Sequence, residues 1–335
     1  MTDESTFLRA IAAFPDDDGP RLVYADWLDE RGDPRAEFIR LQCSLERGID
    51  WITGQPPVDD RRLEELRARE RELIEDMLRV PEPGKPPGIS ELTPEITAIV
   101  AAKPSRISFR RGMIYTLDLS RTPITALPPV FHVDRDLFLF HTAITTLPPD
   151  LHVGGDLSLF HTPISALPPD LHVGGNLHLN NTTITALPLG LHVGGNLHLF
   201  HTPITALPPD LQVAGNIDLS STLIAALPPD IHVGGSLNLA DTNLTSLPPG
   251  LNVGGNLNLS WTRITVLPPD LHVGGELNLS GTSIVAEAAR RILDMPNLSA
   301  HAKMTGLESA GFPMLADEVI RQSVANSGPD ISPRP

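Results

Sequence analysis

Threonine recurs at every twentieth position through the middle and later part of this chain. Nine residues share the spacing: Thr122, Thr142, Thr162, Thr182, Thr202, Thr222, Thr242, Thr262 and Thr282. A strict period of this length indicates a solenoid, in which each repeat is one coil stacked on the next. Solenoids usually present extended binding surfaces, so the period favours binding over catalysis.

Each repeat combines a strand pattern with a proline pair and a glycine pair. The aliphatic positions of one coil are Leu137, Leu139, Ile144, Leu147, Leu151 and Val153. The first two alternate with variable neighbours, which is the two-residue period of a strand. The proline pair at 148–149 blocks a helix, so we expect an extended return side. The glycine pair at 154–155 allows a tight corner where a side chain would collide.

The repeated threonine follows the strand, at the point where the chain turns away from the sheet. A buried hydroxyl at that point satisfies backbone groups that the bend exposes. We therefore expect the nine threonines to form a structural ladder. The alternative is a row of modified or ligand-binding hydroxyls.

The run from Ile114 to Ile124 (IYTLDLSRTPI) resembles the leucine-rich repeat pattern LxxLxLxxNxL, with Thr in place of Asn. The repeat length and the Leu-Pro motif resemble the short repeats of bacterial effector-type leucine-rich repeat proteins. The resemblance implies a nine-coil leucine-rich-repeat-like β solenoid over residues 107–285, with an extended, helix-free return side.

The repeats depart from that pattern at one position. From the second coil on, the first Leu position is Asp134 or a glycine, and apolar residues stand just before it. Leu151-His152-Val153 then forms a second short strand. A flat-sided β-helix is therefore the alternative to a curved horseshoe.

Residues 1–80 have the pattern of helices. Apolar stripes, the Asp18-Gly19-Pro20 start and the Gly32 stop predict four of them. The stretch from Arg21 to Gln42 (RLVYADWLDERGDPRAEFIRLQ) resembles the small repeat-companion domain found at the N-terminus of repeat-bearing proteins in certain bacteria. That family implies a small all-α domain with no known activity, which leaves function to the repeats.

The remaining segments are assigned by composition and pattern. Residues 81–106 are predicted to be a Pro-rich connector, and Phe109 to Ile114 looks like the lead-in strand that such proteins place before their repeats. Residues 286–325 are predicted to be a helical C-terminal cap over the last exposed core, with helices at Ala286 to Leu293 and 314–325. Residues 326–335 are predicted to be a disordered tail.

Charge and cysteine content exclude several classes of partner. The formal net charge of -16 argues against nucleic acid and anionic membranes, which lysine and arginine must neutralise. The single cysteine, Cys43, excludes internal disulfides and fits a reducing compartment. With no signal peptide or membrane span in the sequence, we expect a cytoplasmic protein. Cys43 lies on a predicted helix, where we expect a small buried hydrophobe.

Histidines repeat in two columns of the array. One column holds His132, His152, His172, His192, His232 and His272, with Gln212 and Asn252 at the same position, and the other holds His141, His161 and His201. A single column with a spacing of about 4.8 Å offers at most two ligands per ion, so we predict no metal site. Protonation of stacked imidazoles predicts a loss of stability on acidification.

The outward positions of the strand face change character along the array. Aromatic rings gather in its first half at Phe138, Phe140, His141, Phe160, His161, His178, His198, Phe200 and His201. Later coils carry serine and asparagine there, with Trp261 isolated. Exposed rings on one sheet face predict a binding surface for a protein partner. The alternative is drift among duplicated coils, with the phenylalanines lying flat on their neighbours.

Catalytic patterns are missing from the sequence. We find no Ser/His/Asp arrangement, phosphate loop or paired-cysteine motif, so we predict no enzymatic activity and no cofactor. The predicted function is a protein-interaction scaffold. The alternative is a structural spacer or self-associating rod without a specific ligand, and weak self-association stays open.

Overall fold

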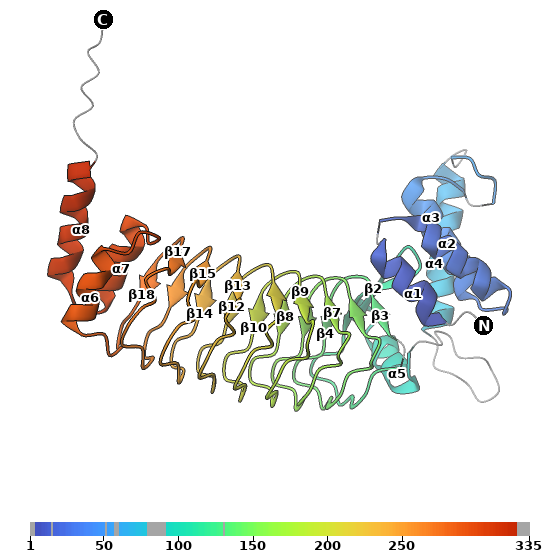
Figure 1. Cartoon of the computed structure of the whole chain (residues 1–335). Coiled ribbons are helices and arrows are strands. Elements are labelled where there is room, and N and C mark those ends of the chain that lie inside the picture. The colour runs from blue at the N-terminus through green and yellow to red at the C-terminus, as the bar shows by residue number, and fades with distance from the viewer. Residues whose placement is uncertain are drawn as a thin grey trace, which may run out of the picture. The chain divides into compact units, whose positions relative to one another are not determined.

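The computed structural model describes residues 4–14, 16–50, 52–56, 60–78, 92–129 and 131–326 (Figure 1). The chain divides into two compact units, residues 1–175 and residues 176–335. Each unit is described on its own below. No helix in the described part of the chain has the length and apolar character needed to cross a membrane.

The first unit begins with four helices that the sequence predicts from local signals. They are α1 (Glu4–Ala13), α2 (Asp18–Asp29), α3 (Arg35–Arg47) and α4 (Asp60–Met77). The Asp17 side chain caps α2 by accepting a hydrogen bond from the Gly19 amide. Gly48 ends α3 in the left-handed conformation, with φ of 64°.

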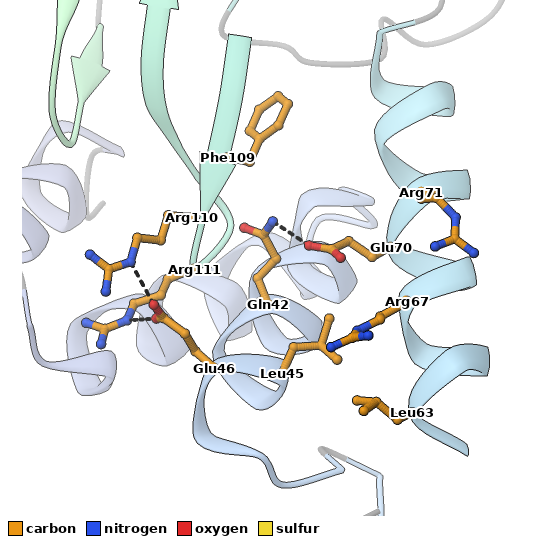
Figure 2. Close-up of a pocket in the computed structure, with 10 residues that line it drawn as sticks. All are labelled: Gln42, Leu45, Glu46, Leu63, Arg67, Glu70, Arg71, Phe109, Arg110 and Arg111. Carbon is orange, nitrogen blue, oxygen red and sulfur yellow. Dashed lines mark hydrogen bonds and ion pairs between the residues drawn. The ribbon is translucent and has the colours of Figure 1, made fainter. Parts of the chain in front are cut away.

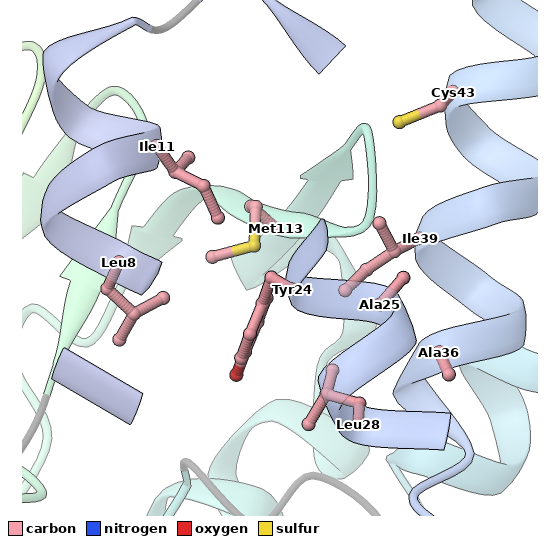
Figure 3. Packing of buried hydrophobic residues seen from close by; sticks show 9 residues of the cluster. All are labelled: Leu8, Ile11, Tyr24, Ala25, Leu28, Ala36, Ile39, Cys43 and Met113. Atoms are coloured by element: carbon pink, nitrogen blue, oxygen red, sulfur yellow. The ribbon is translucent and has the colours of Figure 1, made fainter. Parts of the chain in front are cut away.

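A small hydrophobic core joins these helices to the first residues of the array (Figure 3). It contains Leu8 and Ile11 from α1, Tyr24, Ala25 and Leu28 from α2, Ala36, Ile39 and Cys43 from α3, and Met113 from strand β2 (Met113–Asp118). Because Met113 comes from the array, the helices and the start of the array share one core in this unit.

The connector contains secondary structure that the sequence does not predict. Helix α5 (Pro94–Ala102) and the short 3-10 helix η1 (Pro104–Arg106) occupy its second half. Thr93 caps α5 through its hydroxyl, and Ile96 and Val100 are buried. The Pro-rich stretch of residues 81–91 lies outside the described residues.

The predicted lead-in strand is a hairpin. Strands β1 (Ile107–Arg110) and β2 (Met113–Asp118) pair antiparallel, and the turn between them holds Arg111 and Gly112 in left-handed conformations. The sequence pattern predicts the strand but not the turn, because the arginine at position 111 is not a residue type that favours turns.

Each complete coil then contributes one two-residue strand to each of two parallel sheets (Figure 1). In the first unit, β4 (Leu137–Phe138) and β6 (Leu157–Ser158) follow β2 in one sheet, and β3 (His132–Val133), β5 (His152–Val153) and β7 (His172–Val173) form the other. The second strand that the sequence raises at residues 151–153 is therefore present as β5.

The second unit repeats the same arrangement. One sheet holds β8 (Leu177–His178), β10 (Leu197–His198), β12 (Ile217–Asp218), β14 (Leu237–Asn238), β16 (Leu257–Asn258) and β18 (Leu277–Asn278). The other holds β9 (His192–Val193), β11 (Gln212–Val213), β13 (His232–Val233), β15 (Asn252–Val253) and β17 (His272–Val273).

The predicted aliphatic positions form the core of the coils. Leu137, Leu139, Ile144 and Val153 are completely buried, and Leu151 is nearly so. In the described part of the array, residues 107–129 and 131–285, the return side consists of turns and extended backbone without a helix. A proline pair in place of amide donors accounts for this conformation.

Two sets of side chains satisfy the backbone at the corners. Each of the nine threonine hydroxyls donates to the carbonyl of the leucine three residues before it, at 2.6–2.8 Å. These bonds lie within one coil, as expected of a structural role. A second ladder, which the sequence analysis missed, joins neighbouring coils: the Asp156 amide donates to Asp136 Oδ1 at 2.9 Å, and the Asn216 amide to Asn196 Oδ1 at 2.7 Å.

The ninth coil is incomplete, which corrects the expected count. It supplies β18 but no second strand, because α6 (Ala286–Leu293) begins where the return side would continue. Three second strands in the first unit and five in the second give eight complete coils. Helix α6 has the bounds that the sequence predicts.

Two further helices follow, α7 (Ala300–Ser309) and α8 (Pro313–Asn326), of which only α8 is predicted. Helix α7 covers the free edge of β18. The amide of Leu277 donates to Thr305 Oγ1 at 3.0 Å, and that of Leu279 donates to Ser309 Oγ at 2.9 Å. These hydroxyls satisfy backbone donors that an open sheet edge would leave free for another chain. The predicted tail starts at the last residue of α8, and residues 327–335 lie outside the described residues.

Candidate functional site

We call the sheet that contains β2 and β4 the longer sheet, and the sheet that contains β3 and β5 the shorter sheet. The outward side chains of the longer sheet alternate with the buried leucines. In β4, Leu137 is buried and Phe138 is half-buried, as the two-residue period of a strand requires. The coils repeat in register, so equivalent outward residues lie side by side in columns. The structure thus places the predicted partner-binding residues on this face or at the corner that follows it.

Four rings form one stacked group in the first unit, which we call the first ring cluster: Phe140, His141, Phe160 and His161. The two phenylalanines stack with centroids 4.5 Å apart and planes 8° apart. The two histidines stack at 4.7 Å and 8°. Both phenylalanines are half-buried, whereas both histidines are exposed. Phe138 lies half-buried on β4, outside these stacks.

The second unit carries a smaller group, the second ring cluster: His178, His198, Phe200 and His201. The first two histidines stack at 4.6 Å and 3°, and the ring of Phe200 meets that of His201 edge-on at 5.7 Å. Only His201 in this cluster is exposed, and the other three rings are half-buried.

The exposed histidines owe their position to an unusual backbone conformation. His141, His161 and His201 all have φ of 56°, in the left-handed region. The whole column shares it, since Arg121, Asn181, Ser221, Asp241, Trp261 and Gly281 also have positive φ. Non-glycine residues adopt this conformation at a cost of about 1–2 kcal/mol. The sequence pattern does not predict this conformation, although Asn181 and Gly281 are residue types that favour it.

The histidine column on the shorter sheet, formed by β3, β5 and their later equivalents, begins buried and becomes exposed along the array. His132 is buried at 3% exposure, and its Nε2 lies 2.8 Å from Asp134 Oδ1. His132 stacks on His152 at 4.9 Å, and His152 stacks on His172 at 4.8 Å. Arg21 of α2 reaches Asp134 from the other side, at 2.9 Å. The helices therefore cover the first histidine of the column, and later members are exposed.

Burial, together with the charges of the neighbouring His132 and His172, lowers the pKa of His152 to about 3. The folded chain thus favours neutral His152, whereas an unfolded histidine titrates near pH 6.5. Its contribution to stability is complete above about pH 6.5 and is lost as the pH falls from there toward 3.

We expect His152→Gln to flatten the pH dependence of stability. Between pH 6.5 and 5 the free energy of unfolding of the natural chain should fall about 1 kcal/mol more than that of the variant. Glutamine suits the site, because Gln212 occupies the same position in a later coil. Urea denaturation across this range makes the measurement, with exposed His272→Asn as the control that keeps the natural slope. Parallel curves for the natural chain and His152→Gln would rule the effect out.

Outside these columns, the described residues offer few groups that could act as a nucleophile or a metal ligand. Burial raises the pKa of the Cys43 thiol to about 12, so it stays protonated and unreactive. Its side chain is 2% exposed, as a small core hydrophobe would be. Among the described residues, no group of three or more His, Cys, Asp or Glu side chains is arranged to hold a metal ion.

Comparison with known proteins gives a limited result. No protein-family model matches the chain, and no curated protein matches it. Among solved structures, it is similar to YopM, a leucine-rich effector protein from Yersinia pestis, with a TM-score of 0.30 and 16% identity over 65% of this chain and 77% of that chain. It is also similar to YopM from Yersinia enterocolitica, with a TM-score of 0.20 and 17% identity over 75% of this chain and 70% of that one. Both scores are low, so the two-sheet coil described above rests on the structure of this chain itself.

Proposed function

We propose that this protein is an interaction scaffold that binds a protein partner through the ring clusters of its longer sheet. The observation that carries the proposal is the first ring cluster, in which two phenylalanines and two histidines stack on neighbouring coils and stay accessible. Aromatic side chains dominate the energetics of protein interfaces. Rings that already pack on one another lose little freedom on binding.

The proposal also covers the protein family and the cellular compartment. We assign it to the bacterial leucine-rich repeat proteins with an N-terminal repeat-companion domain, on the motifs given above. A cytoplasmic location accords with its single, buried cysteine. The net charge of -16 favours a partner other than nucleic acid or an anionic membrane.

Because Phe140 and Phe160 are half-buried, removing them should lower the stability of the chain as well as its binding. Losing the stack costs about 0.5–1.5 kcal/mol beyond the lost burial, so a phenylalanine-to-alanine series alone would mix binding with stability. Residues that the chain itself carries in the same columns make better replacements. Serine occupies the phenylalanine column at Ser120, and asparagine occupies the histidine column at Asn181.

We expect a variant with Phe140→Ser, Phe160→Ser, His141→Asn and His161→Asn to lose partner binding by about a hundredfold, the sum of two truncated aromatic anchors at about 1.4 kcal/mol each. The full-length chain is immobilised and exposed to a soluble extract of its source organism, and retained proteins are quantified by mass spectrometry. Circular dichroism checks that the variant is folded.

The matched control removes four exposed rings from the shorter sheet: His172→Asn, His192→Asn, His232→Asn and His272→Asn. Asn252 occupies this column naturally, so the fold should accept the change. A protein that the natural chain and the control retain, and the ring variant loses, supports the proposal. Identical retention by all three would contradict it. Mass that grows with concentration in sedimentation would then favour the spacer or self-associating rod.

A further inference from the structure

A cavity in the helical part of the first unit is independent of the proposed scaffold surface. It has a volume of about 360 Å³ and lies among α3, α4 and the β1–β2 hairpin (Figure 2). That volume falls in the lower part of the range for small-molecule sites. All of its lining residues are described, and all belong to one compact unit.

Arginine dominates the charge around the cavity. Arg67 and Arg71 reach it from α4, and Arg110 and Arg111 reach it from the hairpin, against two carboxylates. Arg71 also pairs with Glu64 at 2.9 Å, and Arg111 lies 3.4 Å from Asp18, so these arginines already have acidic partners outside the lining. Guanidinium groups match the paired oxygens of carboxylates and phosphates, so the lining favours an anion.

Most of the charged groups already hold the walls together. Glu46 on α3 accepts from Arg110 Nε at 2.7 Å and also from Arg111 Nε. Glu70 accepts from Gln42 Nε2 at 2.8 Å, and Arg71 donates to Glu64 at 2.9 Å. The Glu46 bonds join α3 to the hairpin and the Gln42–Glu70 bond joins α3 to α4, so the cavity is formed before any ligand arrives, which reduces the cost of binding.

Arg67 is different. Its side chain is exposed, lines the cavity beside Leu45 (Figure 2), and has no ion pair or hydrogen bond within the part of the chain that the structure describes. An arginine that only stabilised α4 would pair with an acid one turn away, as Arg69 does with Glu72 at 2.7 Å. Arg67 therefore offers a full set of donors to a ligand in the cavity.

Part of the cavity lining is apolar. Leu45, Leu63 and Phe109 line it, and all three are half-buried rather than buried. A bare inorganic anion would leave this surface in contact with water. A ligand with an apolar body would cover it and gain from its burial.

We propose that this cavity binds a small organic anion, in which a carboxylate or phosphate group is joined to an apolar body. Arg67 binds the anionic group, and the apolar body lies on the apolar side chains that line the cavity, Leu45, Leu63 and Phe109. The proposal is independent of the scaffold function, because it uses no residue of either ring cluster.

Titration calorimetry of the full-length chain tests the site with phenyl phosphate and benzoate as probes. We expect at least one of them to bind saturably with a Kd below about 1 mM. Neutral benzyl alcohol should bind at least about tenfold more weakly, because it lacks the anionic group. The better of the two anions identifies the group that the arginines prefer.

The substitution Arg67→Gln should weaken the better probe by about tenfold or more. Arg61→Gln is the matched control, since Arg61 lies on the same helix, pairs with Glu65 at 3.4 Å and does not line the cavity. That control should leave the affinity unchanged. Since Arg67 makes no hydrogen bond or ion pair within the described part of the chain, loss of binding in its variant reports on the site.

Three results would overturn the proposal. The first is no saturable binding of either probe up to about 10 mM. The second is binding that Arg67→Gln and Arg61→Gln weaken equally. The third is a Kd for inorganic phosphate as low as that for phenyl phosphate, which would mean that the site holds an adventitious ion only.

Discussion

Replacing Gly112 with alanine is expected to destabilise the first unit by about 3–5 kcal/mol. A Cβ at this position would lie 2.3 Å from both Cα and Cγ1 of Ile39, a buried residue of α3. The backbone of Gly112 also has φ of 77°, which alanine adopts only with strain. Its amide donates to Gln42 Oε1 at 2.6 Å, so the hairpin cannot move away from α3 without losing this bond as well.

Gly48→Ala separates the two contributions to this loss. Gly48 has φ of 64°, close to that of Gly112, but a Cβ there would meet no atom within 4 Å. It should therefore show only the backbone strain, about 1–2 kcal/mol. Urea denaturation followed by tryptophan fluorescence compares the variants. Equal losses would show that the hairpin and α3 are not in close contact in solution.

Much of the fold could be predicted because its signals are local. The start at Asp18-Gly19-Pro20, the stop at Gly32 and the apolar stripes of α1 to α4 lie within a few residues of the elements they define. The twenty-residue period likewise predicts the coils, their strands and their core positions, because every repeat carries the same local pattern. Each coil reinforces the same pattern, so one irregular residue such as Asp134 does not obscure it.

The features that were missed depend on contacts between distant residues or on backbone angles. Helix α7 has no strong apolar stripe, and its place is set by Thr305 and Ser309 bonding to β18. The left-handed column mixes Arg, His, Asn, Ser, Asp, Trp and Gly, so residue type alone does not reveal it. Of the candidate site, the sequence could supply the rings and their columns but not their stacking, since exposure and stacking follow from the packing of neighbouring coils.

The contact between the helices and the array could not be predicted for the same reason. Arg21 and Asp134 are 113 positions apart in the sequence. The one local sign was that Asp134 stands where later coils have glycine, such as Gly154 and Gly174. The partners of the Asp134 carboxylate, Arg21 and His132, can be identified only from the structure, in which α2 lies against the first coil.

We expect Arg21→Met to destabilise the first unit by about 3–5 kcal/mol, because it leaves a buried carboxylate without its cation. Arg21 is 1% exposed and Asp134 is 10% exposed. Burial acts to raise the pKa of Asp134, but hydrogen bonds and charges from His132 and Arg21 hold it below its ordinary value. Removing Arg21 takes away one of these compensations, and methionine offers no donor in its place. Hydrogen exchange of α2 and of the first coil measures the loss in each element.

Adding Asp134→Gly should restore most of that stability. The second substitution removes the unpaired charge and installs the residue that later coils use at this corner, and replacing both members of a buried pair costs far less than breaking it. A double-mutant cycle should therefore give a coupling energy of at least about 2 kcal/mol between Arg21 and Asp134. A coupling near zero would mean that the two charges act separately. The helices would then be held to the array by apolar contacts such as that of Met113.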